Sequence, residues 1–281
     1  MNLRRVRRAE TLRRLGAHPR VLPWTALLLR ARIVRHAGTF ALREALGRRG
    51  TFAYRLRESG LHVAVRHGSG DVVTLGEVFH DRQYEPPADL EWELAPVRRV
   101  IDLGANIGLF GAFAAARWPQ AEIVAFEPDP GNASVHERTI ELNALDGRWR
   151  LIRAAAGASS ARAEFMAGGA ALAHLVDVLE GAASPQDGQR RIEVDVQDVL
   201  GLIADADLLK LDIEGGEWAI LGDPRFRRSP PRAVVLEYHP RFCPGADPRL
   251  AAEQALAAAG LCVRSLWHRE DGHGMLWGWR D

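Results

Sequence analysis

The chain has 281 residues, of which 47% are hydrophobic and 26% charged, as expected for one large globular core with a smaller addition. Its two cysteines, Cys243 and Cys262, exclude a disulfide framework and lack the spacing of zinc ligands, so we expect a reducing, cytoplasmic location. The formal net charge of +1 conceals an uneven distribution, because residues 1–49 hold thirteen arginines and only two acids, an excess of about +11.

The arginine-rich segment is predicted to contain a helix that begins near Pro23 and ends at Gly38. Its apolar run at residues 26–29 is too short for a secretory signal or a membrane span. One face of the helix would carry five apolar residues: Trp24, Leu27, Leu28, Ala31 and Val34. That face could pack on the acidic remainder of the chain, pair with another subunit, or lie peripherally on the inner membrane surface. Nucleic-acid binding is not expected, because the arginines lack interleaved aromatic residues.

A small β-hairpin is expected next. Apolar and polar residues alternate over residues 52–56 and 61–65, on either side of a turn at Glu58-Ser59-Gly60. Pro86 and Pro87 then indicate a junction before the main domain.

Residues 100–127 are predicted to form a strand, a glycine turn, a helix and a second strand. The buried strand 100–103 leads into the turn at 104–108, the helix covers 109–117, and the second strand, 123–126, ends at Glu127. Backbone N–H groups can approach a ligand closely at such a turn, since glycine has no Cβ. An acid at the tip of the next strand can accept hydrogen bonds from a ribose diol. We therefore predict a cofactor that contains a nucleoside.

The glycine spacing favours S-adenosyl-L-methionine over a dinucleotide. A dinucleotide fingerprint would read G-x-G-x-x-G, whereas here three other residues separate Gly104 from Gly108 and Asp102 precedes the turn. A carboxylate at that position would repel a pyrophosphate, but it could hold the cationic amino acid end of the methyl donor. The predicted cofactor-binding residues are Asp102, Gly104, Ala105, Asn106, Gly108, Glu127 and Pro128.

The middle of the chain alternates helices and strands. We expect a helix at 133–143, a third core strand at 149–155, and a loop at 157–185 with one short strand at 163–166. A strand at 191–196 and a short helix at 198–203 follow.

A second acidic strand end comes next. The fourth core strand, 208–211, runs into a glycine turn beside Asp212 and Glu214. Ligands of doubly wound sheets bind outside the carboxyl ends of strands, so both acids should face the same site as the first glycine turn. Lys210 is the only lysine among 37 basic residues. Its ammonium could neutralise the acids in a strand-end ion pair or touch a substrate hydroxyl.

The last predicted elements complete the sheet. Residues 233–238 form a continuously apolar fifth strand, as expected when helices cover both faces. A helix at 250–259 stops at Gly260, and a hairpin formed by 262–267 and 275–279 closes the domain.

Three motifs together resemble the FkbM family of S-adenosylmethionine-dependent methyltransferases. They are Asp-Leu-Gly-Ala-Asn-Ile-Gly at 102–108, Phe-Glu-Pro-Asp at 126–129, and Leu-Lys-Leu-Asp-Ile-Glu-Gly-Gly-Glu-Trp-Ala-Ile-Leu at 209–221. The match covers roughly Val65 to Trp279. The Lys-x-Asp-x-Glu-Gly block is the more specific motif, whereas most methyltransferases of this fold share the glycine turn.

The resemblance implies an α/β fold: a Rossmann-like, seven-stranded methyltransferase sheet with a closing antiparallel hairpin. The predicted parts are a basic helical extension at 1–50, a small β-hairpin segment at 51–95 and a class I methyltransferase domain at 96–281. The implied activity is methylation of an oxygen, commonly a hydroxyl of a sugar, glycan or secondary metabolite. It does not define the acceptor or the oligomeric state.

In-line methyl transfer to a hydroxyl requires alignment first and a general base second. Asp212 is the first candidate for the base, with Glu214 and His239 as further catalytic candidates and Lys210 and Glu237 as substrate-binding ones. No metal is expected, because the chemistry does not require one. Two other classes stay open: a nicotinamide- or nucleotide-binding Rossmann enzyme, and a non-catalytic cofactor-binding partner subunit.

Overall fold

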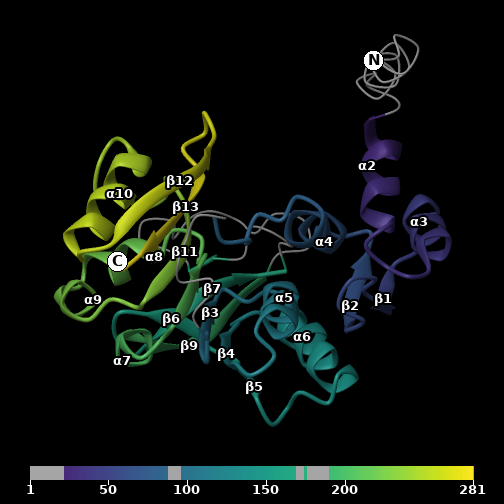
Figure 1. Ribbon diagram of the computed structural model, residues 1–281, viewed down its shortest axis with the longest axis horizontal. Coiled ribbons are helices and arrows are strands. Elements are labelled where there is room, and N and C mark those ends of the chain that lie inside the picture. The colour runs from purple at the N-terminus through teal and green to yellow at the C-terminus, as the bar shows by residue number, and fades with distance from the viewer. Residues whose placement is uncertain (1–21, 88–95, 169–173, 176–189, 281) are drawn as a thin grey trace. The chain divides into compact units, whose positions relative to one another are not determined.

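The computed structural model describes residues 22–87, 96–168, 174–175 and 190–280 (Figure 1). The chain divides into two compact units, Met1–Gln83 and Tyr84–Asp281. Part of the arginine-rich segment (1–21) and of the predicted 157–185 loop (169–173 and 176–185) lies outside the described residues. The boundaries between the three predicted parts of the chain, at residues 50 and 95, remain predictions.

The N-terminal unit contains the predicted hairpin and helices around it. Strands β1 (Gly50–Arg55) and β2 (His62–His67) pair antiparallel with Tyr54 opposite Val63, which confirms the hairpin. Tyr54, Val63, Ala64 and Val65 are buried, so both faces of β2 are covered at its centre. The helices are α2 (Leu22–Ala31), α3 (Ala37–Ala45) and α4 (Asp71–Phe79).

The prediction of one helix that ends at Gly38 is wrong. Helix α2 ends at Ala31, and Val34 instead forms an antiparallel bridge with Leu56 of the hairpin. Gly38 lies in the first turn of α3. Of the five residues assigned to one apolar face, Trp24 and Leu28 are exposed while the other three are buried. None of the described helices is long and apolar enough to cross a membrane.

The second unit is built on a seven-stranded sheet with the strand order β12-β13-β11-β10-β3-β4-β5. Its strands are β3 (Arg99–Leu103), β4 (Glu122–Phe126), β5 (Trp149–Ile152), β10 (Leu208–Leu211), β11 (Ala233–Tyr238), β12 (Cys262–His268) and β13 (Gly274–Trp279). The pairs from β11 to β5 are parallel, and β13 runs antiparallel to both of its neighbours. This arrangement confirms the predicted Rossmann-like methyltransferase sheet and its closing antiparallel hairpin.

Helices cover the sheet, which explains why its central strands are mostly apolar. They are α5 (Leu109–Arg117), α6 (Pro130–Leu142), α7 (Leu200–Ala204), α8 (Glu217–Gly222), α9 (Pro224–Arg228) and α10 (Pro248–Ala258). Helix α5 packs on β3 and β4, α6 on β5, and α10 on β11 and β12 (Figure 1). The close packing is visible at Gly111, where an added Cβ would meet the ring of Trp149 at 2.0 Å.

A second sheet contains part of the predicted 157–185 loop. Strands β6 (Ala155–Gly157), β9 (Arg190–Asp198), β7 (Ala161–Ala167) and β8 (His174–Leu175) pair in that order. The short strand predicted at 163–166 lies within β7. The predicted single strand at 149–155 is wrong, because β5 and β6 belong to different sheets. The Ala154 N–H donates to the Ile152 carbonyl at 2.9 Å, a tight turn that separates the two strands.

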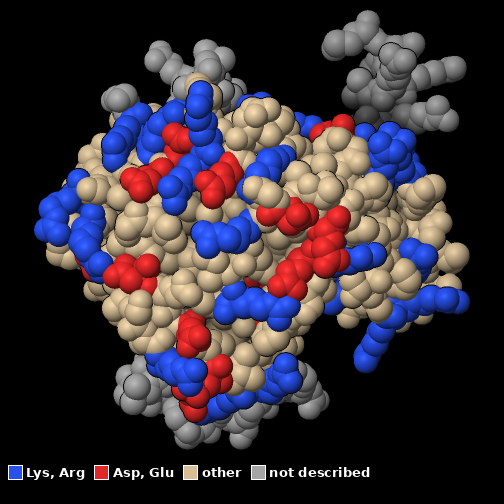
Figure 2. Space-filling view, turned by 90° about the horizontal axis from the view of Figure 1, so that it is seen from below, with Lys and Arg blue, Asp and Glu red and all other residues tan. Residues whose placement is uncertain are grey.

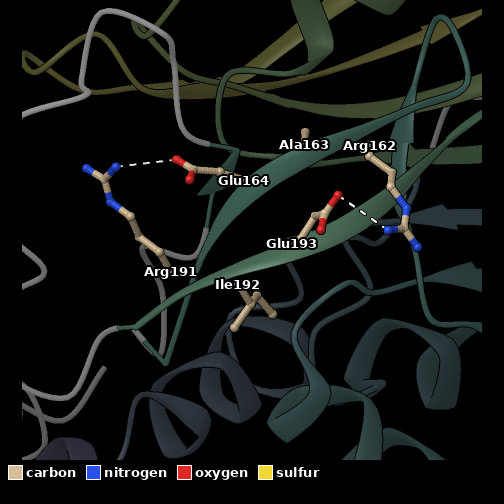
Figure 3. Close-up of a pocket in the computed structure, with 6 residues that line it drawn as sticks. All are labelled: Arg162, Ala163, Glu164, Arg191, Ile192 and Glu193. Carbon is tan, nitrogen blue, oxygen red and sulfur yellow. Dashed lines mark hydrogen bonds and ion pairs between the residues drawn. The ribbon is translucent and has the colours of Figure 1, made fainter.

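The surface carries mixed charge. On the face shown in Figure 2, arginines and acids are interspersed, in agreement with exposed ion pairs such as Arg138 with Glu141. A hollow of about 390 Å³ lies against β7 and β9 (Figure 3). Its charges pair with one another, Arg162 with Glu193 at 3.4 Å and Arg191 with Glu164 at 3.3 Å. None of the predicted site residues lines it.

Candidate active site

The predicted site residues gather at the carboxyl ends of four neighbouring parallel strands, β11, β10, β3 and β4. Strand β3 leads to the glycine turn and β4 to Glu127 and Pro128. Strand β10 carries Lys210 and leads to Asp212, and β11 carries Glu237. Parallel pairing therefore brings segments more than a hundred residues apart to one edge of the sheet.

The glycine turn depends on the missing side chains. Gly104 has φ +77°, and an added Cβ would lie 1.8 Å from the carbonyl oxygen of Asp212. Gly108 has φ +83°, and its Cβ would meet the ring of His136 at 2.6 Å. The N–H groups of Gly104 and Ala105 both donate to the Phe126 carbonyl, at 3.1 and 2.9 Å. The turn is thus pressed between the ends of β4 and β10.

Glu127 fixes the turn from the other side. One carboxylate oxygen accepts from the Asn106 N–H and the other from the Asp129 N–H, both at 2.8 Å. Asn106 itself has φ +49°. Burial raises the pKa of Glu127 to about 7, although the two backbone hydrogen bonds oppose the shift.

Asp102 is fully buried, and neither of its carboxylate oxygens has a hydrogen-bond partner among the described residues. Burial raises the pKa of Asp102 to about 6, while the nearby ammonium of Lys210, 3.7 Å from Oδ1, lowers it. A buried acceptor without a donor is unfavourable unless a ligand supplies one. The cationic amino group of a methyl donor would be such a ligand.

Lys210 is also buried, with 3% of its surface exposed. Its ammonium donates to the Gly104 carbonyl at 2.7 Å and pairs with Asp212 at 3.0 Å. Burial opposes the charged form, but the two aspartates outweigh it and raise the pKa of Lys210. This geometry matches the ion-pair interpretation of Lys210; its contact with a substrate stays a prediction.

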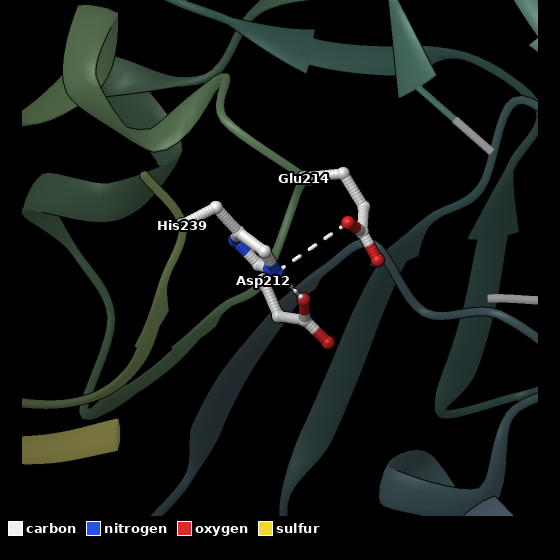
Figure 4. Close-up of side chains that lie close together, drawn as sticks. All are labelled: Asp212, Glu214 and His239. Atoms are coloured by element: carbon white, nitrogen blue, oxygen red, sulfur yellow. Dashed lines mark ion pairs between the residues drawn. The ribbon is translucent and has the colours of Figure 1, made fainter. Parts of the chain in front are cut away.

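Three side chains converge beyond β10 and β11, and we call Asp212, Glu214 and His239 the acceptor cluster (Figure 4). The His239 Nε2 lies 3.4 Å from Glu214 Oε2 and 3.9 Å from Asp212 Oδ1. Burial raises the pKa of Glu214 to about 7, with the charge of Asp212 acting in the same direction. For His239 burial acts the other way, but the hydrogen bond and charge of Glu217 and the charges of Asp212 and Glu214 raise its pKa to about 9.

Glu237 lies in β11, close to His239 along the chain. Burial raises the pKa of Glu237 to about 8, and the charge of Asp212 adds to the shift. The site therefore holds more carboxyl groups than its one lysine and one histidine can balance, which favours a cationic ligand.

Two carboxylates that sequence reasoning did not assign to the site organise it. Glu217 is fully buried and accepts from the Gly215 N–H, the His239 N–H and the His239 ring. Asp129 caps α6 by accepting from the N–H groups of Gly131 and Asn132, and its other oxygen accepts from the Gly168 N–H at 2.8 Å. The Asp-Pro pair at 129–130 is a typical signal of a helix N-terminus, so the sequence could have predicted that Asp129 caps α6.

The chain belongs to the FkbM methyltransferase domain family, whose model matches residues 102–253. That range begins at Asp102 and contains the glycine turn, Glu127 and the whole acceptor cluster.

Two curated relatives are similar to parts of this chain. Methyltransferase 1 of Beauveria bassiana (strain ARSEF 2860) is 30% identical over 140 residues, 43% of this chain and 56% of that protein. Methyltransferase sdnD of Sordaria araneosa is 49% identical over 49 residues, 17% of this chain and 19% of that protein. The aligned part of this chain therefore spans about half of the first relative and a fifth of the second.

Among solved structures, an O-methyltransferase family protein from Burkholderia thailandensis aligns with TM-score 0.42 and 15% identity over 75% of this chain and 58% of that one. The dimethyltransferase RosA from Streptomyces davawensis aligns with TM-score 0.41 and 12% identity over 75% and 56%.

Proposed function

We propose that this protein transfers the methyl group of S-adenosyl-L-methionine to a hydroxyl oxygen of a small molecule or glycan. The observation that carries the proposal is the buried carboxylate of Asp102, whose oxygens have no hydrogen-bond partner among the described residues and which directly precedes the glycine turn. A cationic donor would satisfy that carboxylate, whereas the pyrophosphate of a dinucleotide would be repelled by it.

The residues present fit the methyl donor. Asp102 would accept from the amino group of its methionine part, and Glu127, at the tip of β4, from the ribose hydroxyls. The glycine turn would lie along the donor, because the missing Cβ atoms of Gly104 and Gly108 let the turn pack against the Asp212 carbonyl and the His136 ring at the ends of these strands. When bound, the donor supplies a sulfonium methyl group that an oxygen can displace.

The protein's main contribution is alignment. Holding two reactants in line can supply about 7–11 kcal/mol, whereas a general base adds about 10²–10⁴-fold, or roughly 3–5 kcal/mol. The acceptor hydroxyl would lie at the acceptor cluster, because its acids stand beside the glycine turn through the Gly104–Asp212 contact.

Proton removal falls to the acceptor cluster. Asp212 remains the first candidate for the base, with Glu214 second because its raised pKa of about 7 is near the optimum for proton transfer at neutral pH. His239 has a pKa of about 9 and is therefore a cation at neutral pH, suited to orienting carboxylates rather than to accepting a proton.

Calorimetry and an acceptor screen test the proposal. The donor and its demethylated product should bind with micromolar affinity, and isotope-labelled donor should mark hydroxyl-bearing saccharides or metabolites, with the label in an O-methyl group. Asp212→Ala should lower turnover at least tenfold and change donor affinity only a fewfold. Absence of donor binding at millimolar concentration would refute the proposal, and a label found on nitrogen or carbon would refute its oxygen specificity.

A further inference from the structure

We propose that the acceptor cluster is a divalent-cation site, with Asp212 Oδ1, Glu214 Oε2 and His239 Nε2 as its protein ligands. One ligand atom from each residue lies within 4.8 Å of the others (Figure 4). An ion placed among them could reach all three with small side-chain adjustments, since metal–ligand bonds to oxygen and nitrogen are about 2.0–2.3 Å long.

The histidine is held as metal-binding histidines usually are. Its Nδ1 is hydrogen-bonded to Glu217 Oε1 at 3.1 Å, and Glu217 is fully buried. Ligating histidines commonly donate their second ring N–H to a carboxylate, which fixes the tautomer and the ring orientation. The main chain is fixed too, because the His239 N–H donates to Glu217 at 2.8 Å and its carbonyl accepts from Trp218 Nε1 at 2.9 Å. Nε2 is thereby directed at the two carboxylates.

The carboxylates are arranged to share a cation. Lys210 occupies the Oδ2 side of Asp212, so Oδ1 faces His239. Glu214 adopts φ +54°, a conformation that non-glycine residues avoid, and this turn of the backbone brings its carboxylate to the histidine. Glu217 accepts from the His239 ring and Lys210 pairs with Asp212, so each partner of the cluster is held in place by a further charged group. Without a metal ion, a protonated His239 would supply part of the positive charge between the two carboxylates.

The donor set indicates the kind of ion. Two carboxylate oxygens and one imidazole nitrogen suit Mn²⁺, Mg²⁺, Zn²⁺ or Fe²⁺, and three protein ligands leave coordination positions open. On the proposed function, from which this step follows, an open position would bind the acceptor hydroxyl, lower its pKa and direct its oxygen at the methyl group. The hydroxyl proton would pass to the second oxygen of Glu214, because the ion and Lys210 would occupy both oxygens of Asp212. Metal binding itself requires neither the donor nor the acceptor.

Mn²⁺ is the probe, because its electron paramagnetic resonance reports binding directly. Full-length protein, treated with chelator and dialysed, should bind one Mn²⁺ per chain with micromolar affinity in the absence of methyl donor. Pulsed spectra should show nitrogen coupling from one imidazole. His239→Gln should abolish that coupling and weaken binding at least tenfold, and Glu214→Gln should weaken binding while keeping the coupling.

Two further variants sharpen the test. Glu217→Gln, which only positions the histidine, should weaken Mn²⁺ binding about 10–100-fold, the usual effect of changing such a partner. Glu193→Gln, an exposed acid in the hollow on β9, is the matched control and should leave binding unchanged. Thermal unfolding verifies that each variant is folded.

The outcomes separate this proposal from the proposed function. No stoichiometric Mn²⁺ binding up to 1 mM, or nitrogen coupling that persists in folded His239→Gln, overturns the metal site. Methyl transfer that survives chelation without loss would leave the function intact and overturn the role of the ion in catalysis. Mn²⁺ binding to a protein that binds no methyl donor would keep the metal site and refute the function.

Discussion

The buried carboxylate of Asp102 should make the folded protein less stable as the pH rises, and Asp102→Asn should remove that effect. Burial raises the pKa of Asp102 from 3.8 to about 6 in the folded state. An acid whose pKa is raised by folding binds more protons in the folded state than in the unfolded state. Its stabilising contribution is therefore present at low pH and is lost as the pH rises from the unfolded pKa through the folded pKa. The difference of about two units corresponds to about 3 kcal/mol.

About 2 kcal/mol of this effect falls between pH 4.5 and 7.5, a range suited to urea unfolding followed by tryptophan fluorescence. Asparagine has the same shape but no charge, so its own packing and hydrogen-bonding effects are independent of pH. The unfolding free energy of Asp102→Asn relative to wild type should therefore rise by about 2 kcal/mol across the range. Asp146→Asn, at an exposed acid, is the control. Parallel pH profiles for wild type and Asp102→Asn would refute the reasoning.

Three other variants test separate parts of the site. Gly104→Ala should destabilise the fold by more than about 2 kcal/mol in urea unfolding, because its Cβ would lie 1.8 Å from the Asp212 carbonyl at φ +77°, whereas Gly147→Ala, with open space around it, should not. Donor affinity measured by calorimetry should rise with pH through about 7 as Glu127 ionises, and Glu127→Gln should bind more weakly and lose the part of the rise that is centred near pH 7. Asp129→Ala should lower stability by about 1 kcal/mol through loss of the α6 cap; an unchanged melting temperature would contradict this.

The sequence predicted the parts of the fold whose signals are local. The strand and turn at 100–108 and the apolar strand at 233–238 carry their pattern within a few residues, and the structure has them at those positions. The hairpin at 50–67 was found for the same reason, since alternation and a turn lie side by side.

The second sheet could not be predicted in the same way. The break between β5 and β6 lies at Arg153 and Ala154, where neither glycine nor proline marks a turn. Strands β7 and β9 pair across more than twenty residues, so their partnership depends on contacts that a local pattern does not contain. The sequence does not predict helix α3, because a glycine that follows an apolar helical pattern usually indicates a helix end, whereas Gly38 lies in the first turn of α3.

The candidate site was predicted residue by residue but not as a cluster. Parallel strand ends indicated that Asp212 and His239 would be near one edge of the sheet. Their convergence with Glu214 depends on a left-handed backbone at Glu214 and on the buried Glu217, neither of which is visible in residue spacing. From the sequence we expect no metal, and the Mn²⁺ binding experiment tests that expectation.

The contact between Gly104 and the Asp212 backbone has a consequence for the order of events during turnover. Since the Lys210 side chain also joins the same two loops, we expect a displacement of one strand end to be transmitted to the other. We expect the two reactants to influence each other's affinity, and thermodynamic reciprocity requires that the factor be equal in both directions. The affinity for the donor would then depend on whether the acceptor is bound, and the affinity for the acceptor on whether the donor is bound.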